Sequence, residues 1–489
     1  MSGLWYFWGS LALLLGGYFV YGAFVEKVFG ADFGRLTPVK SRRDGVDYIE
    51  LPRYKIFLIQ LLNIAGLGPV LGPILGALYG PSALLWVVFG CIFGGAVHDY
   101  CSAMMSLRYG GASYPEIIGR NLGTGVRRFM EVFAIAFMIM VGAVFVLGPA
   151  ALLANLTSFG LPFWATLIFA YYFLATIMPI DTIIGRIYPF FSILLLVMAF
   201  GLAGSLMLSG RPVLPNTDFF VNTDPTGLPI WPLLFITIAC GAISGFHATI
   251  GTGTTPKMIG KERDVLFVGY GAMLVEGFVA IMALIAACVL VPADYFAINA
   301  PADKFAALGM SVVDLPTLEK EVAESLMHRP GGSVSLAVGM AHIFGQIPWM
   351  SHLMSYWYHF AIMFEAVFIL TAVDAGTRVG RFFLQEMIGK VIPKFGDKNW
   401  WPGIVVTSFL FTGAWGYLVY TGDISSIWPL FGISNQLLAS VTLLIGTTML
   451  LRMNKTKYAW ITAAPGIFMT FITFWAGIWL IMYQYIPTQ

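Results

Sequence analysis

The chain has 489 residues, of which 58% are apolar and only 11% are charged, and its mean hydropathy is +0.81. These values lie far from those of soluble domains and indicate an integral membrane protein. The formal net charge is only +2, so the total charge gives no reason to expect nucleic acid or an acidic partner. The four cysteines lie in apolar stretches at spacings that fit neither a disulfide framework nor a zinc site, so we expect no bound metal.

Twelve apolar stretches approach the roughly 20 residues that a membrane-spanning helix needs. The first has neither a basic leader nor a small-residue cleavage site, so we interpret it as a spanning helix and not as a signal peptide. The sequence therefore predicts an all-α membrane protein with about 12 transmembrane helices. In chain order they are 4–25, 56–79, 82–107, 129–156, 162–178, 183–208, 230–250, 266–291, 350–373, 403–420, 427–451 and 459–483.

Basic residues set the expected orientation. The segment between the first two predicted helices carries seven lysines and arginines, from Lys27 to Lys55. Placing this segment in the cytoplasm puts about 23 of the 27 basic residues inside and about 4 outside, as the positive-inside rule expects. Both termini then face outward. A missed or invented helix would invert every later loop and remove this bias, so the bias supports the number of predicted helices.

Two predicted helices are interrupted by glycine-rich sequence, at 65–69 and at 241–247. Non-helical backbone at membrane depth is tolerated only where it lines a cavity or is buried in protein, and paired breaks in two halves of a chain point to a transporter binding site. The interrupted helices are five spans apart, so they enter the membrane from opposite sides, as in an inverted repeat. We expect the two unwound stretches to face one another across a hydrated hollow halfway through the membrane.

This arrangement predicts a ten-helix transport core with a peripheral helix at each end. A long outer segment carries two helix-like pieces, 317–328 and 333–345, and either forms a lid over an outer vestibule or packs passively. On the inner side, we expect 113–128 to form one interfacial helix with Arg127 and Arg128 at the headgroups. The predicted boundaries are 1–55 for the N-terminal helix and cytoplasmic loop, 56–451 for the core, 56–208 and 230–451 for its two repeats, 292–348 for the outer segment and 452–489 for the C-terminal helix.

Long motifs are distributed through the predicted core. They are AGLGP at 65–69 followed by Gly72-Pro73, GGAVHD at 94–99, FITIACG at 235–241 continuing through SGFH at 244–247 to GTTPK at 253–257, YHF at 358–360 through Glu365 to DAGTR at 374–378, and WPLFGISNQ at 428–436. Over the whole ten-span core, the chain resembles the carbon starvation protein A family of prokaryotic nutrient transporters.

The resemblance implies a multi-pass protein of the prokaryotic cell (inner) membrane that imports peptides or pyruvate, coupled to a cation gradient. Larger family members carry additional hydrophobic segments that this sequence lacks, so peptide and pyruvate stay alternatives. The ten-span inverted arrangement is also similar to that of the amino acid, polyamine and organocation superfamily, a likeness at the level of fold.

Substrate-binding residues are expected first at the break formed by Ala65, Gly66, Gly68 and Pro69. The half-helix that begins near Gly68 presents the positive end of its dipole, which suits the carboxylate common to peptides and pyruvate. The alternative is a proline kink with close helix packing on the glycines. The matching break in the other half of the chain favours the binding site.

The second break continues into the most polar stretch of any predicted helix. Ser244 and His247 are three residues apart and share a helix face, which a string of threonine hydroxyls follows. A protonated His247 can donate to a carboxylate and link proton binding to substrate binding. In the alternative, each hydroxyl bonds the preceding turn of its own helix and the histidine bridges helices. The substrate-binding residues expected here are Ser244, Gly245, Phe246, His247, Thr252 and Thr254.

Four acidic residues lie within or beside the predicted helices, where a charge costs roughly 3 kcal/mol unless it is paired or neutralised. They are Asp99, Glu276, Glu365 and Asp374. Each is a candidate proton relay or cation ligand, and the alternative for each is a structural acid that bridges helices. His98 precedes Asp99 and joins this candidate group, but neighbours on a helix diverge by about 100° and need not touch.

A cation site is expected near the cytoplasmic end of the eighth core helix. Thr371 and Asp374 share a face there. The superfamily resemblance implies that this region meets the first broken helix, where Asn63 and the Ile64 carbonyl would complete an oxygen-lined site for sodium or a proton. The alternative is a helix-end ion pair between Asp374 and Arg378.

These features predict a secondary active importer that alternates access around a central site, driven by a proton or sodium gradient and without another cofactor. Its expected partners are the lipid bilayer and a small-molecule substrate, and the oligomeric state is left open. Asn435 and Gln436, which lie at the start of the tenth core helix, are expected to have a structural or gating role. No phosphate-binding P-loop occurs in the sequence, which disfavours ATP hydrolysis.

Two other classes of protein are alternatives. Glycine breaks and polar rings also build ion or solute channels. Ser244 and His247 could serve an intramembrane hydrolase as nucleophile and base. However, the sequence shows no third orienting group at a recognisable spacing and no glycine-serine elbow, so we expect no enzyme.

Overall fold

The computed structural model describes residues 4–486 except 33, 44–47, 179, 210–226, 323, 330–331, 351–352, 398–399 and 422–423. Within these residues the regular secondary structure is entirely helical, and nine helices are long and apolar enough to cross a membrane. Several consist of consecutive segments. The segments are α1 (Leu4–Gly16), η1 (Gly17–Gly22) and α2 (Ala23–Phe29); α6 (Pro81–Leu85), η3 (Trp86–Gly95) and α7 (Ala96–Arg108); α9 (Thr124–Leu156); α11 (Ile180–Ser209); η5 (Leu266–Tyr270) and α14 (Gly271–Cys288); α19 (Met354–Gly389); α20 (Trp401–Thr421); α21 (Ile424–Arg452); and α22 (Trp460–Leu480).

The remaining three predicted spans are also helical, but none is a long straight helix. The predicted span 56–79 is a pair, α4 (Arg53–Ile64) and α5 (Gly68–Gly76) with the short η2 (Ala77–Tyr79), bent by 51° at the break. The span 230–250 is divided into α12 (Ile230–Thr237) and α13 (Gly245–Gly253), and α10 (Leu161–Ile177) has 17 residues. The fold class is therefore confirmed. The number of twelve crossings and the division into repeats stay predictions, and the predicted link 210–226 lies outside the described residues.

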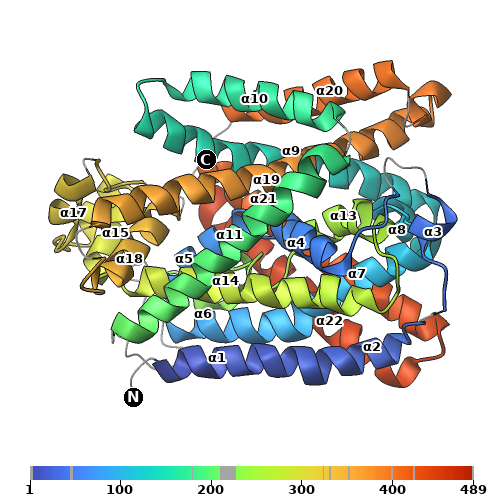
Figure 1. The fold of residues 1–489 in the computed structure, drawn as a ribbon, viewed down its shortest axis with the longest axis horizontal. Coiled ribbons are helices and arrows are strands. Elements are labelled where there is room, and N and C mark those ends of the chain that lie inside the picture. The colour runs from blue at the N-terminus through green and yellow to red at the C-terminus, as the bar shows by residue number, and fades with distance from the viewer. Residues whose placement is uncertain are drawn as a thin grey trace.

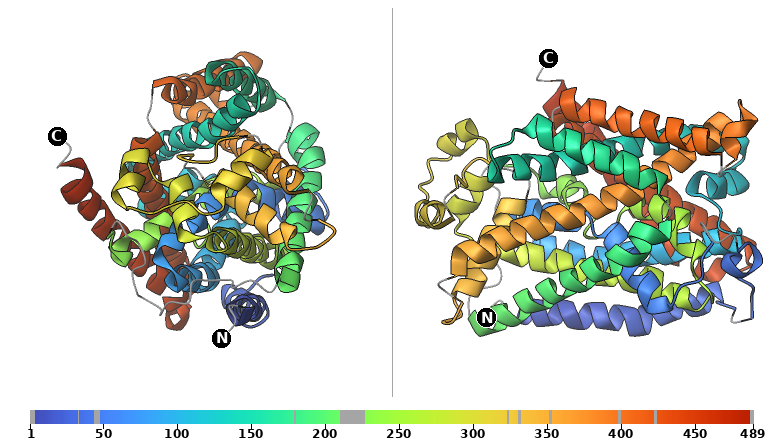
Figure 2. Two further views of the ribbon diagram at one scale, coloured as in Figure 1. Left: turned by 90° about the vertical axis from the view of Figure 1, so that its left-hand side faces the viewer. Right: turned by 45° about the horizontal axis from the view of Figure 1, so that its top comes forward.

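Shorter helices cover the two ends of the bundle. They are α3 (Pro38–Ser41), α8 (Tyr114–Leu122), η4 (Thr255–Lys257), α15 (Pro292–Asn299), α16 (Ala302–Ala307), α17 (Leu315–Val322), α18 (Ser333–Gly345), η7 (Pro393–Gly396), η8 (Thr456–Tyr458) and η9 (Ile481–Tyr485). Figure 1 shows α15, α17 and α18 at one end of the long helices and α3 and α8 at the other. Viewed from the end that carries α15 to α18, α1 and α22 lie at the periphery (Figure 2).

Three predicted boundaries are wrong. The interfacial helix 113–128 is divided, because Gly123 has a φ of +94° and ends α8, so that Arg127 and Arg128 belong to the first turns of α9. The piece 317–328 is the shorter α17, whereas 333–345 matches α18. Finally, α19 does not stop at Val373 but continues to Gly389, which places Asp374 in the helix interior.

At each break, a residue with non-helical dihedral angles stands at the end of one half-helix or at the start of the next. Ala65 ends α4 with a ψ of 59°, and the Gly66 N–H then donates to the Ile64 carbonyl at 2.8 Å. Ser244, in extended conformation, precedes the first turn of α13. Pro69 stands in the first turn of α5, where its missing N–H costs no helical hydrogen bond.

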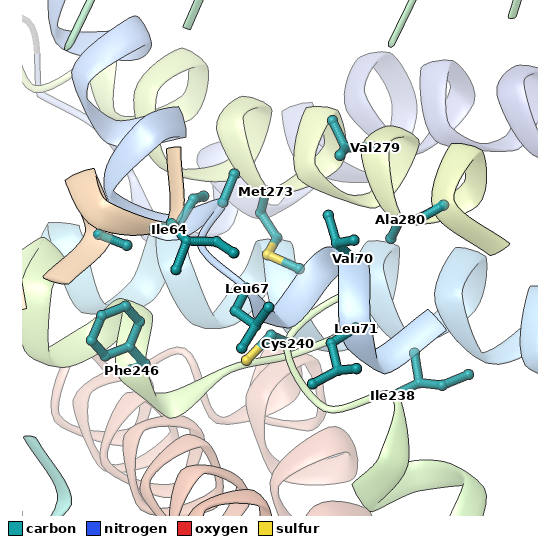
Figure 3. Packing of buried hydrophobic residues seen from close by; sticks show 14 of the residues in the cluster. Ile64, Leu67, Val70, Leu71, Ile238, Cys240, Phe246, Met273, Val279 and Ala280 are labelled. Atoms are coloured by element: carbon teal, nitrogen blue, oxygen red, sulfur yellow. The ribbon is translucent and has the colours of Figure 1, made fainter. Parts of the chain in front are cut away.

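The two breaks pack directly on each other. Cys240 of the second break fills the space beside Gly68, where an added Cβ would lie 2.1 Å from the Cys240 Cβ. One and two turns further along α5, Gly72 faces the Thr237 carbonyl and Gly76 faces the Ile238 side chain. Figure 3 shows Cys240 and Ile238 against α5. The expectation of a hollow between the unwound stretches is therefore wrong at these contacts, because small residues let the two backbones approach closely.

We expect Gly68→Ala to destabilise the protein by about 1–3 kcal/mol, because the new methyl group overlaps Cys240 in a packed interior. Thermal unfolding of the detergent-purified variant would measure the loss. The double variant Gly68→Ala/Cys240→Gly should recover part of it, since the overlapping side chain is removed. Equal melting temperatures for wild type and Gly68→Ala would contradict the contact.

Candidate functional site

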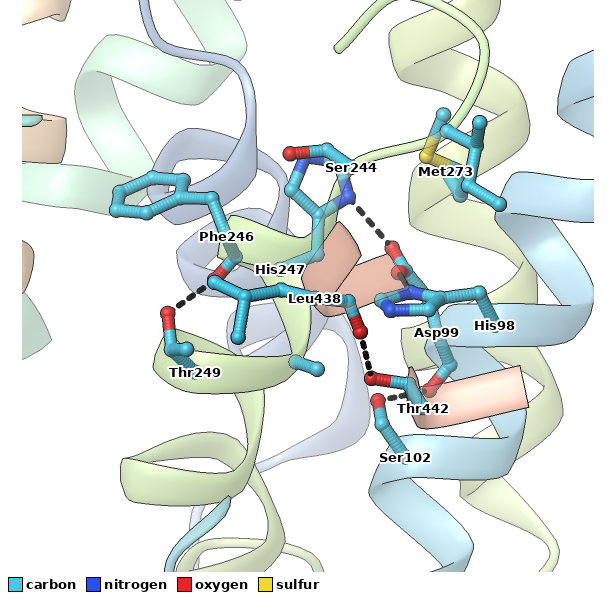
Figure 4. A network of polar contacts seen from close by, with 12 residues as sticks. His98, Asp99, Ser102, Ser244, Phe246, His247, Thr249, Met273, Leu438 and Thr442 are labelled. Atoms are coloured by element: carbon cyan, nitrogen blue, oxygen red, sulfur yellow. Dashed lines mark hydrogen bonds and ion pairs between the residues drawn. The ribbon is translucent and has the colours of Figure 1, made fainter. Parts of the chain in front are cut away.

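A cluster of ionisable side chains from three helices lies beside the second break. Asp99 of α7 is its centre: Oδ1 lies 2.8 Å from His98 Nδ1, and Oδ2 lies 3.0 Å from His247 Nδ1 of α13. On its other side, His247 Nε2 lies 3.4 Å from Glu276 Oε2 of α14. All four residues are buried, with at most 3% of any of them exposed. Figure 4 shows the Asp99 carboxylate between the two imidazole rings.

Glycines bring these three helices close enough for the contacts. Gly95, one residue before α7, lies so near the second break that an added Cβ would stand 2.3 Å from the Ala242 carbonyl oxygen. Gly269 of η5, just before α14, faces the Asp99 carbonyl in the same way, at 3.3 Å. Side chains at either position would push α7 away from α13 or α14. The glycines therefore bring the acid and the two histidines within hydrogen-bonding distance.

The cluster can hold different numbers of protons. The Asp99 carboxylate accepts from both imidazoles, so that each of its two oxygens has a partner. Within the described part of the chain, His98 Nε2 and both Glu276 oxygens have no hydrogen-bond partner. Imidazole nitrogens and carboxylate oxygens are the groups that take up and release protons, and groups this close titrate as one unit. The cluster therefore has the chemistry that binding or releasing a proton requires.

The threonine hydroxyls that follow the second break bond within their own helix. Thr249 donates to the Phe246 carbonyl at 2.7 Å, Thr252 to Ala248 at 2.7 Å and Thr254 to Ile250 at 3.0 Å, the geometry of the intrahelical alternative. The polar groups of the break itself are bonded by α21. Asn435 Oδ1 accepts from the Ser244 hydroxyl at 3.1 Å and from the Phe246 N–H at 2.8 Å. Substrate contact by Thr252 and Thr254 stays a prediction.

The predicted cation-site residues lie where α4 approaches α19. An added Cβ on Gly66 would stand 3.0 Å from the Ala372 side chain, so the first break reaches the part of α19 that carries Thr371 and Asp374. The Tyr188 hydroxyl of α11 lies 3.0 Å from Asp374 Oδ2 and 2.6 Å from the Thr371 carbonyl oxygen. Among the described groups, Asp374 Oδ1 and both polar atoms of the buried Asn63 side chain lack a partner.

The alternative ion pair between Asp374 and Arg378 does not form. The Arg378 guanidinium instead donates to the carbonyls of Ala175 and Met178 at the end of α10, at 2.7 Å each. Glu365 is the other candidate acid of α19, and it contacts the outer segment: its Oε1 accepts from Ser333 of α18 at 3.0 Å. The structure thus brings Asp99, His98, His247 and Glu276 together but leaves Asp374 and Glu365 in separate surroundings.

Three polar partners were missed by sequence reasoning. Tyr188 bonds the Asp374 region, Gln60 of α4 accepts from Thr255, and Cys240 accepts from Asn435 Nδ2 at 3.2 Å. Gln60 carried a signal, because an amide within an apolar span rarely lacks a partner. Tyr188 and Cys240 carried none, since both are common core residues of apolar helices.

The long apolar helices and the two broken ones define a multi-pass membrane protein, and its fold is similar to that of LeuT-type transporters. Over 88% of this chain and 99% of the other, the structure resembles MhsT in complex with L-phenylalanine, with a TM-score of 0.58 and 14% sequence identity. A manganese transporter from Eremococcus coleocola matches with a TM-score of 0.52 and 12% identity over 90% of each chain. These likenesses establish the fold alone.

The chain belongs to the carbon starvation protein CstA family, whose sequence profile matches residues 2–158 and 147–476. It is 39% identical to the peptide transporter CstA of Bacillus subtilis (strain 168), over 98% of this chain and 91% of the relative. It is 34% identical to the pyruvate/proton symporter BtsT of Escherichia coli (strain K12), over 97% of this chain and 81% of the relative. The predicted family resemblance is confirmed.

We expect Asp99→Asn to lower the stability of the protein strongly, by about 3–5 kcal/mol, because the amide cannot accept from both imidazoles and leaves a buried partner unpaired. Thermal unfolding in detergent would measure this loss. Ser102→Ala is the matched control on α7, since the Ser102 hydroxyl bonds only the backbone carbonyl of Asp99 in this region, at 3.0 Å. Similar melting temperatures for the two variants would show that the cluster does not stabilise the helix contacts.

Proposed function

We propose that this chain imports small organic carboxylates, either peptides or pyruvate, across the prokaryotic cell membrane by proton-coupled alternating access. The family membership and the names of the relatives support the class of substrate. The fold supports a binding site at the two breaks, because half-helix ends at mid-membrane bind the charged groups of solutes in transporters of this type.

One observation carries the proposal: α13 connects the second break, where we propose that the substrate binds, to the ionisable cluster. Its first turn, at Gly245 and Phe246, presents the positive end of the half-helix to a carboxylate, and His247 in the same turn contacts Asp99 and Glu276. A change of proton number in the cluster alters the forces on His247, and a bound carboxylate alters those on the adjacent N–H groups. Proton and substrate therefore act on one short helix, which is a physical basis for coupling.

A proton fits this cluster better than sodium does. Two of its four members are imidazoles, which bind protons near neutral pH, whereas hard cations are held by oxygen ligands. Sodium is the alternative that the region around Asp374 and Asn63 supports, since oxygens of both side chains are buried there without a partner among the described groups. The two ions predict different driving forces, so transport measurements distinguish them.

The distribution of segments supports the proposed orientation. The helices α3 and α8 lie together at one end of the bundle, and α15, α17 and α18 of the outer segment lie at the other (Figure 1). The positive-inside rule assigns the loops that carry α3 and α8 to the cytoplasm. This orientation places both termini outside.

Uptake into proteoliposomes tests the function. Labelled pyruvate or dialanine should accumulate when the outside is more acidic than the lumen, and preloaded unlabelled substrate should drive counterflow in the absence of a gradient. An imposed sodium gradient at constant pH should have no effect. Large unitary currents without counterflow would instead support a channel, and failure of both solutes to exchange would refute the proposed importer.

We expect Glu276→Gln to abolish accumulation driven by the pH gradient while counterflow persists, because the amide fills the same space but cannot carry a proton. Initial rates of uptake and of exchange in the same proteoliposomes measure the two activities. Glu131→Gln is the matched control: Glu131 is also buried, but it pairs with Arg127 and Lys390 away from the cluster. Gradient-driven accumulation at the wild-type level in Glu276→Gln would remove Glu276 from the coupling mechanism.

A further inference from the structure

The first turn of α13 is capped by a side chain from another helix. Ser244 occupies the N-cap position and is of the type that usually caps its own helix. Its hydroxyl instead donates to Asn435 Oδ1 of α21 at 3.1 Å, and the same oxygen accepts from the Phe246 N–H at 2.8 Å. Asn435, which is fully buried, thus supplies the cap that Ser244 does not.

The starts of both half-helices meet at this point. Asn435 Nδ2 donates to Cys240 Sγ at 3.2 Å, and Cys240 packs against Gly68, the first residue of α5. The positive ends of the α5 and α13 dipoles therefore converge on the Cys240–Asn435 contact. Beside it, the Gln436 amide donates to the Ile243 carbonyl of the break at 3.3 Å, while its buried Oε1 has no partner among the groups that the structure describes. These features form a built polar site inside the membrane, occupied by an uncharged oxygen.

A carboxylate oxygen fits the position of Asn435 Oδ1 better than an amide oxygen does. It accepts from an N–H and an O–H in the same way, and its charge makes such hydrogen bonds roughly twice as strong. It also interacts favourably with both helix dipoles. The amide is therefore the weaker of two possible ligands for the same donors.

We infer that Asn435 is an internal substitute for the substrate carboxylate, which the substrate displaces when it binds. The inference rests on the proposed function. It adds that the substrate carboxylate is the group recognised, that the Ser244 hydroxyl and the Phe246 N–H are the donors, and that Asn435 is the residue displaced. Displacement removes the polar link that the Asn435 side chain makes from α21 to Ser244 and Phe246, and leaves Gln436 as the remaining side-chain link to the break among the described residues. Substrate binding thereby weakens the attachment of α21 to the second break.

The substitutions Asn435→Ala and Asn435→Asp should change the affinity for the substrate in opposite directions. In Asn435→Ala the two donors have no internal ligand, so the substrate no longer competes, and the dissociation constant should fall about fivefold, the equivalent of one helix cap. In Asn435→Asp a permanent carboxylate occupies the donors, and the dissociation constant should rise more than tenfold. A purely structural cap predicts weaker binding in both variants.

Isothermal titration of the detergent-purified full chain with pyruvate and with dialanine measures these constants, and melting temperatures report folding. Ser440→Ala is the matched control on α21, because the Ser440 hydroxyl bonds its own helix at the Gln436 carbonyl; it should bind as wild type does. Tighter binding by Asn435→Ala together with weaker binding by Asn435→Asp is the expected result.

The outcomes separate this inference from the function on which it rests. A wild-type chain that binds neither solute overturns both. Wild-type binding with unchanged or weaker binding in Asn435→Ala overturns the inference alone. If Asn435→Ala does not fold, wild-type or tighter binding by Asn435→Asp still overturns the inference.

Discussion

The structure depends on the need of every backbone polar group in the membrane interior for a hydrogen-bond partner inside the protein. Two unwound stretches create this need, and different devices meet it. At the first, the chain turns on itself through the Gly66 N–H and the Ile64 carbonyl. At the second, Asn435 and Gln436 of α21 reach into the break. The second break is thus held by a helix distant in sequence, so its geometry depends on where that helix stands.

Close packing joins the two breaks and the ionisable cluster into one continuous region. Gly68 and Cys240 bring α5 against the second break, and Gly95 brings α7 against it from another side. Through α7 the contact continues to Asp99 and the histidines. Because such an interior has few voids, a displacement at one of these points is opposed or followed by the others. A displacement at either break is therefore transmitted to the ionisable cluster through direct contacts.

Features encoded locally could be predicted from the sequence, and features made by tertiary contact could not. Glycines in apolar stretches marked both breaks, together with Pro69 at the first, and charged residues in apolar stretches marked Asp99 and Glu276 as candidates. Their assembly with His247 requires three helices to meet, which no local pattern reports. The end of α19 was misplaced for a related reason: Asp374 and Arg378 lower the hydropathy, but their partners are other helices and not water. Similarly, the Asn435 amide gave no sign that it caps a helix 189 residues away.

The length of α19 has a mechanical consequence. Its 36 residues extend about 54 Å at 1.5 Å per residue, well beyond the hydrocarbon thickness of a bilayer. Near one end, His359 pairs with Glu324 of the outer segment, and at the other the helix packs on η7. A rigid helix of this length links the two ends of the bundle, so a tilt about its middle moves the contacts at its two ends in opposite directions.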